Sequence, residues 1–448
     1  MLLAFKNITK IPELRKKLFI TLALIVVYRI GTFIPTPGID GHALSQFFAR
    51  IASQQGNTLF GIMNLFSGGA MQKCTIFALG IMPYISASII LQLLTVVIPY
   101  LEKLAKEGEM GRKKITQYTR YGTVVLSAIQ SLFISMWLEN PAHFNGSIIV
   151  PNPGWDFKLL VVITLTAGTA FIMWLGEQIT ERGIGNGISI IISVGIISRA
   201  PQALQETFML LSPFNPAQRQ LDPLMFLFML GMLVFVVGTV ILITQGQRKI
   251  PVQYARRVIG RKVYGAQSTY IPLRINQAGV IPIIFASSVL MFPATMAAIV
   301  QNDLLQKISG SLEYGKGLYC IAEFVFIVFF CFFYTAITFN PIEIADMMKR
   351  NGGFIPGIRP GKSTAEFLDK IMIRITSAGA IFLAIIAILP NLIYRYFKLP
   401  FDISSFFGGT GLLIVVGVLL DTMRQIESHL LVRNYEGFMR KGKLKGRR

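Results

Sequence analysis

Side chains able to carry out covalent chemistry are few and scattered in this chain of 448 residues. The only histidines are His42, His143 and His429, and no His-Glu-x-x-His, Gly-x-Ser-x-Gly or Walker-type pattern occurs. Each of these patterns carries one reaction class: metal-assisted hydrolysis, acyl transfer through a serine triad, and nucleotide hydrolysis. The sequence therefore predicts a protein that is not an enzyme and holds no cofactor.

A glycine-rich run at residues 183–187 (GIGNG) has the composition of a phosphate cradle. A cradle of that kind follows a β-strand, whereas this run lies between two long apolar stretches. Glycine also permits tight turns, because it adopts positive φ angles without steric cost. We interpret the run as a tight cytoplasmic turn between two membrane helices.

Acidic groups near the middle of the bilayer would indicate an ion-coupled transporter, since coupling needs a site whose charge changes with the driving ion. Here Glu177, Glu323 and Asp421 are all close to an end of an apolar stretch, where each can reach an interface or pair with a neighbour. This pattern weakens the case for a transporter. A small-solute permease stays open as the alternative function.

The elements that must position any site are ten long apolar stretches. A helix needs ~20 mostly apolar residues to cross the hydrocarbon, because its backbone hydrogen bonds must be satisfied internally. Hydrophobic residues make up 53% of the chain and charged residues 15%, which is typical of a polytopic membrane protein. The predicted spans are 18–34, 74–100, 121–138, 157–176, 188–211, 223–244, 276–300, 318–339, 371–393 and 408–423.

Positive charge alternates between the loops that separate these spans. On one side lie 33 of the 43 Lys and Arg residues, and short cytoplasmic loops are the ones that retain such charge. Both termini are therefore predicted to be cytoplasmic. The net charge of +21 can attract anionic lipids, nucleic acid or an acidic protein face. Arg29, inside the first span, is expected to extend its guanidinium to the outer interface.

Five spans precede residue 212 and five follow it, which predicts two domains, 1–211 and 212–448. An odd number per half makes the second half enter the membrane from the opposite face, so any repeat is inverted. Inverted repeats place a substrate path at the interface between the halves. The fold class expected is an all-α polytopic membrane protein, with ten transmembrane helices in two inverted five-helix halves around a central pore.

An external segment from residue 35 to residue 73 is too long to be a simple connector. Its end, residues 59–70, is a short apolar helix candidate on a hinge formed by Gly68 and Gly69. Irregular backbone at membrane depth is tolerated only when it is covered by protein or lines a cavity. We predict a re-entrant piece, with an interfacial helix as the alternative.

Several strings resemble those of the bacterial SecY family, the protein-conducting channel subunits of the Sec translocon. The resemblance extends from about residue 11 to residue 446, with ten spans in the expected order. The strings that carry it are 66–70 (FSGGA), 81–88 (IMPYISAS), 117–122 (QYTRYG), 176–189 (GEQITERGIGNGIS) and 356–361 (PGIRPG).

The resemblance implies a ring of apolar side chains at the narrowest point of a pore. In this chain every position of the ring is isoleucine: Ile81, Ile85, Ile188, Ile192, Ile284 and Ile414. A narrow apolar neck offers ions no replacement for their hydration shell. The family also has a plug that closes the outer side at rest, which corresponds here to residues 60–70. Phe66 and Ser67 would belong to the plug, and Gly68 and Gly69 would be its hinge.

The resemblance further implies a lateral gate, through which hydrophobic substrate segments leave sideways into lipid. The gate would lie between spans two and three of one half and spans seven and eight of the other. Polar groups there would bias closure by hydrogen bonds of ~0.6 kcal/mol each. The candidates are Ser86, Gln92, Asn276 and Ser288.

Two basic cytoplasmic loops, 245–275 and 340–370, resemble the family's docking sites for the SecA motor and the ribosome. The first has the pattern of a protruding hairpin, with Arg248, Lys249, Arg256 and Arg257. In the second, prolines and glycines flank Arg359, so the turn presents one guanidinium at its tip. The family implies SecE and SecG as partner subunits, signal-bearing preproteins as substrates and the bacterial inner membrane as location. Solvated loops without a docking role are the alternative.

Overall fold

The structure is a computed structural model without ligands or partner chains. It describes residues 11–41, 43–45, 47, 64, 67–144, 149–211, 223–254, 257–259, 262–264, 268–299, 310–312, 316–397, 403 and 410–441.

Each of the ten predicted apolar stretches contains a helix. By length and apolar content, six helices in the described ranges could cross a membrane, or seven if α5 and α6, which meet at a 99° bend, form one span. The chain is therefore a multi-pass membrane protein. The helices are α2 (Pro12–Gly31), α5 (Met82–Val97), α6 (Pro99–Lys106), α7 (Glu109–Glu139), α8 (Trp155–Arg182), α9 (Gly187–Ile197), α10 (Ala200–Leu211), α11 (Pro223–Gln245), α12 (Ile281–Ile299), α14 (Gly317–Thr338), α15 (Pro341–Arg350), α16 (Lys362–Phe397) and α18 (Thr410–Lys441).

Several helix boundaries differ from the predicted spans; α7, for example, begins at Glu109 rather than at residue 121. The second helix begins at Met82 rather than at residue 74, because the preceding turns place Cys74 and Gly80 at positive φ angles of 42° and 58°. Helix α16 begins nine residues earlier than expected, and α18 continues to Lys441. Hydropathy marks where the chain leaves the hydrocarbon. It does not mark where a helix ends, since charged residues continue a helix in water.

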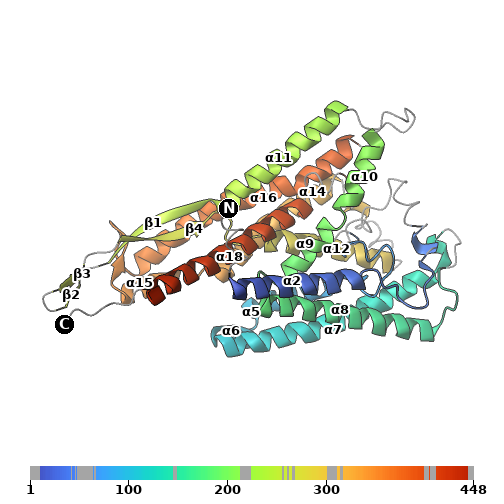
Figure 1. The fold of residues 1–448 in the computed structure, drawn as a ribbon, viewed down its shortest axis with the longest axis horizontal. Coiled ribbons are helices and arrows are strands. Elements are labelled where there is room, and N and C mark those ends of the chain that lie inside the picture. Colours follow the sequence, from blue (N-terminus) through green and yellow to red (C-terminus); the bar gives the residue numbers. More distant parts are fainter. Residues whose placement is uncertain are drawn as a thin grey trace.

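The helices lie in two groups (Figure 1). One contains α2, α5, α7 and α8, and the other contains α11, α14, α16 and α18. Between the groups, α12 contacts α5 and α7, and α18 contacts α9. The interface between the groups therefore involves elements from both ends of the sequence.

Two small antiparallel sheets lie at one end of the molecule, together with α15 (Figure 1). Strand β1 (Gln247–Tyr254) pairs with β4 (Ser268–Arg274), and β2 (Arg257–Ile259) pairs with β3 (Lys262–Tyr264). The hairpin predicted for the first basic loop is thus confirmed, although the fold is not purely helical. The second loop contributes β5 (Gly353–Phe354), which pairs with β1. The two loops consequently form one unit with its own buried cluster, which includes Ile250, Leu273, Met348, Ile355 and Leu368.

Candidate functional site

Four elements from both groups direct isoleucine side chains into the same interior. Ile81 caps α5 and Ile85 follows one turn later, while α9 provides Ile188 and Ile192. Helices α12 and α18 provide one each, Ile284 and Ile414. Five of the six are at most 4% exposed and belong to one buried apolar cluster, and half-buried Ile188 packs against that cluster.

The contacts between these elements join the isoleucines across the molecule. Helix α12 contacts both α5 and α18, and α18 in turn contacts α9. The result is an apolar interior to which both groups contribute, as a constriction between two halves requires. Branched aliphatic side chains offer no ligand to an ion and hold no water. Their role as a pore ring stays a prediction.

The end of the predicted plug is a tight, buried turn. Ser67 is 2% exposed; its Oγ donates to the carbonyl of Asn64 at 3.3 Å and accepts from the amide of Met71 at 3.2 Å. Gly68 and Gly69 have φ angles of 64° and 89°, in the left-handed region that favours glycine. Phe66 and most of residues 60–70 lie outside the described residues.

Arg29 contacts this turn, which the sequence did not predict. Its Nη1 lies 3.5 Å from the carbonyl oxygen of Gly68, and its Cζ lies 5.4 Å from the centroid of the Phe33 ring. The turn comes close to this end of α2 and presents a carbonyl acceptor to the guanidinium. The expected position of the guanidinium at the outer interface stays a prediction.

Three of the four candidate gate residues form hydrogen bonds within their own segments, and the fourth, Ser86, lies in α5. Gln92 Nε2 donates to Ser88 Oγ at 3.2 Å, and Asn276 Nδ2 donates to the carbonyl of Gly279 at 3.0 Å. Ser288 Oγ donates one turn back, to Ile284. The amide oxygen of Gln92 is buried without a hydrogen-bond partner in the structure. Helices α5 and α7 do contact α12, but these bonds do not cross that seam.

The three acidic residues near the span ends pair with neighbours, one of the two outcomes expected. Buried Glu323 accepts from Asn391 Nδ2 at 2.8 Å and so joins α14 to α16. Asp421 Oδ1 lies 3.6 Å from Arg424 Nη1. These contacts provide a structural reason for both carboxylates without a transport site.

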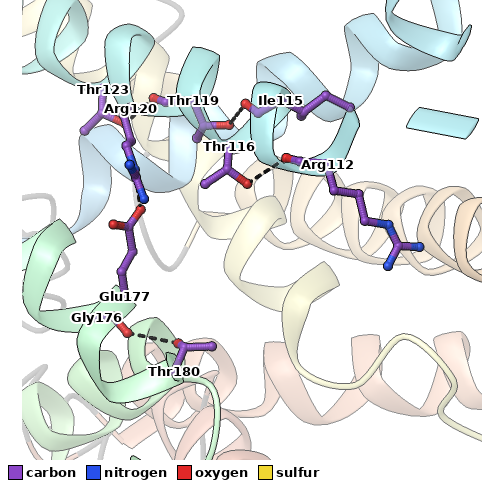
Figure 2. A network of polar contacts seen from close by, with 9 residues as sticks. All are labelled: Arg112, Ile115, Thr116, Thr119, Arg120, Thr123, Gly176, Glu177 and Thr180. Carbon is purple, nitrogen blue, oxygen red and sulfur yellow. Dashed lines mark hydrogen bonds and ion pairs between the residues drawn. The ribbon is translucent and has the colours of Figure 1, made fainter. Parts of the chain in front are cut away.

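The third acidic residue joins two of the strings that carry the family resemblance. Glu177 of α8 and Arg120 of α7 point toward one another, and Arg120 Nε lies 2.8 Å from Glu177 Oε1 (Figure 2). Beside this pair, Thr180 Oγ1 donates to the carbonyl of Gly176 and accepts from the amide of Gly187. The network thereby anchors the glycine-rich turn to the end of α8.

The glycine-rich turn also connects the two groups of helices. The amide of Ile184 donates to Thr21 Oγ1 of α2 at 3.1 Å, and the amide of Gly185 donates to Gln425 Oε1 of α18 at 2.8 Å. Ile184 is buried in a cluster with Leu14 and Ile426. The predicted tight turn is therefore a joint between distant elements. Thr21 and Gln425 carry no local sequence signal for this role, because their partners are far away in the chain.

Replacing Gln425 with alanine should loosen this joint. One net hydrogen bond contributes ~1 kcal/mol, so hydrogen exchange at the amide of Gly185 should accelerate about fivefold. Mass spectrometry of the peptide spanning residues 183–187 measures this rate. Gln425→Glu, which keeps an acceptor of the same reach, is the control. Equal protection in the alanine variant and the parent would contradict the assignment.

The candidate docking residues lie at the end of the molecule that carries the sheets. Arg248 and Lys249 are exposed on β1, and Arg359 is exposed in the turn between β5 and α16. The carbonyl of Arg359 accepts from Thr364 Oγ1 at 2.8 Å, which secures the turn. Arg257 belongs to β2, and Arg256 lies outside the described residues. The pairing of β1 with β5 brings the two basic loops together.

Comparison with known proteins identifies close relatives over the whole length. A family model described as SecY matches residues 75–423. The protein translocase subunit SecY of Escherichia coli strain K12 is 48% identical over 441 residues, covering 97% of this chain and 96% of the relative. The subunit of the same name from Streptomyces galbus is 49% identical over 447 residues, covering 98% of this chain and 100% of the relative.

Solved structures share the fold at low sequence identity. A structure described as a protein-conducting channel has a TM-score of 0.60 at 18% identity and covers 96% of this chain and 95% of its own. Sec61 in a canine ribosome–channel complex has a TM-score of 0.56 at 17% identity, with the same coverage.

Proposed function

This chain belongs to the SecY family, and from that premise we propose that it is the central channel subunit of a Sec protein translocase. It conducts unfolded preproteins across the membrane and releases hydrophobic segments sideways into lipid. The family is one of channels rather than enzymes, so the energy comes from outside the chain. The observation that carries the proposal is one buried apolar cluster that contains five of the six isoleucines and against which Ile188 packs.

A polypeptide channel at rest must block ions yet accept chemically varied side chains. An apolar constriction meets both needs, because ions gain no ligands there and aliphatic side chains yield to whatever passes. A permease would need polar groups in the same place to bind its solute. The collar of Ile81, Ile85, Ile188, Ile192, Ile284 and Ile414 is the opposite of such a site, which favours the channel.

We assign ten membrane crossings in two inverted halves, residues 1–211 and 212–448. Two observations support this architecture: a helix lies in each apolar stretch, and the helices divide into two groups in contact through α5, α7, α9, α12 and α18. The lateral gate lies where α5 and α7 meet α12. Because the bonds of Gln92, Asn276 and Ser288 stay within their own segments, these three bonds do not resist its opening.

The partners follow from the family and from the distribution of charge. The exposed basic residues of β1 and of the Arg359 turn would dock the SecA motor or a ribosome. SecE and SecG would complete the complex, and anionic lipids would meet the cytoplasmic charge. The location proposed is a bacterial inner membrane, with both termini in the cytoplasm.

Reconstitution tests the proposal directly. The protein is placed in vesicles with SecE, and SecA, ATP and a signal-bearing preprotein are added outside. We expect the preprotein to become protected from protease only when ATP is present. The same preprotein without its signal should stay accessible. Absence of protection while the motor hydrolyses ATP would favour the permease.

A further inference from the structure

The backbone of Gly68 lies directly against the backbone of α9. A Cβ atom built on Gly68 would lie 2.9 Å from the Cα of Gly195 and 3.4 Å from its carbonyl oxygen. Such a distance to a Cα is shorter than a carbon–carbon contact allows. The two chain segments approach this closely only because residue 68 has no side chain.

This contact is close to the proposed constriction. Gly195 is buried in α9 and follows Ile192 by three residues, which is slightly less than one helical turn. Along α9, a group resting on Gly195 therefore lies ~4.5 Å beyond the level of Ile192, on the side away from the cytoplasmic turn at residues 183–187. That is the position in which a closing segment would cover the outer side of the collar.

Helix α2 completes the surroundings of Gly68. The hydroxyl of Tyr28 would lie 3.4 Å from a Cβ at Gly68, and Tyr28 is 1% exposed with its ring stacked on Phe77 at 6.0 Å. From the same helix, Arg29 directs Nη1 toward the Gly68 carbonyl. Gly68 thus lies between Gly195 of α9 on one side and Tyr28 and Arg29 of α2 on the other.

We propose that Gly68 is the seating residue of the plug and that Gly195, Tyr28 and Arg29 form the seat, an inference that rests on the proposed channel function. Seating depends on a glycine because any side chain at residue 68 would collide with the Gly195 backbone. The guanidinium of Arg29 holds the seated turn by donating to the carbonyl oxygen of Gly68.

The neighbouring glycine offers a matched control. Gly69 also has a positive φ angle, so alanine is strained there as it is at Gly68. A Cβ at Gly69, however, would meet nothing within 4 Å. The comparison of Gly68→Ala with Gly69→Ala therefore separates the contact with Gly195 from backbone strain.

The test uses a cysteine placed at Ser67, which is buried beside the seat. Full-length protein carrying Ser67→Cys, in its complex with SecE, is treated from outside with a membrane-impermeant maleimide. The same variants without Ser67→Cys are labelled in parallel, because Cys320 is half-buried. We expect the introduced thiol to label about tenfold faster in Gly68→Ala than in Gly69→Ala, the ratio that corresponds to ~1.4 kcal/mol.

Equal labelling rates in the two alanine variants would overturn the proposal. If Gly68→Ala fails to accumulate in the membrane, Arg29→Gln takes its place, since it removes the cation without changing the plug backbone. Labelling in Arg29→Gln should exceed that of the parent, and an unchanged rate would again overturn the seat. The readout does not depend on export. If the preprotein is not protected but the thiol still labels faster in Gly68→Ala than in Gly69→Ala, only the channel function is contradicted.

Discussion

Resting ion conductance should rise about tenfold or more when Ile81, Ile188, Ile284 and Ile414 are all replaced by threonine. A hydroxyl in the neck gives water a partner, and each such hydrogen bond contributes ~1 kcal/mol. Four of them lower the barrier to wetting by several kcal/mol, and ~1.4 kcal/mol already corresponds to a tenfold change in rate. Single-channel recording in a planar bilayer, without motor or substrate, measures the conductance.

The same four positions replaced by valine are the control. Valine and threonine have nearly the same shape, so both variants lose a similar volume from the buried cluster to which these side chains contribute. Loss of this volume costs about 0.5–1.5 kcal/mol of stability at each position, and the valine variant includes that cost without adding a hydroxyl. The valine variant should stay close to the parent in conductance. Equal conductance of the threonine and valine variants would contradict the pore assignment.

Charge reversal at Arg359 should reduce motor-dependent export about tenfold or more. Arg359 is exposed in a turn held by Gly357 at φ 81° and Gly361 at φ 105°, and its backbone carbonyl is bound by Thr364. The side chain is therefore free to contact a partner while the backbone stays in place. Disrupting a charged contact at a protein interface costs about 2–5 kcal/mol of binding free energy, which weakens the affinity for the partner roughly 30-fold or more. Export, which depends on that affinity, should therefore fall at least about tenfold.

Arg359→Glu is compared with Lys362→Glu, which makes the same change in net charge three residues later, at the start of α16. An export assay with SecA and a pull-down of SecE are carried out on both variants. Export should fall in Arg359→Glu while SecE is retained, and Lys362→Glu should export close to the parent level. Equal loss in both variants would indicate that only the overall charge of the loop matters.

Local patterns were sufficient for much of the fold. Apolar stretches of membrane length located the helices, since a segment in lipid must satisfy its own backbone hydrogen bonds. The alternating residues of the first basic loop indicated its hairpin, which β1 and β4 confirm. Helix ends were less accurate. Helix α18 continues to Lys441 because water, unlike lipid, permits a helix of charged residues.

Contacts between distant segments could not be inferred in this way. The pairing of β5 with β1 involves a strand of two residues, too short to leave a pattern. Arg29 was expected at the interface, and only the fold shows that the Gly68 carbonyl lies beside it. The gate candidates were chosen by position, and their bonding within their own segments depends on rotamers that sequence does not specify.

By itself, the sequence determined that this is a multi-pass helical membrane protein, its loop charges predicted basic loops on one side of the membrane, and its strings indicated the SecY family. Those features follow from composition and order along the chain, because apolar segments partition into lipid and charged segments stay in water. Only the tertiary structure decided that six isoleucines from four elements share one interior, that Gly185 binds Gln425 and that Gly68 rests on Gly195. Such contacts depend on how helices pack across long sequence separations, where a shift of one residue changes every neighbour.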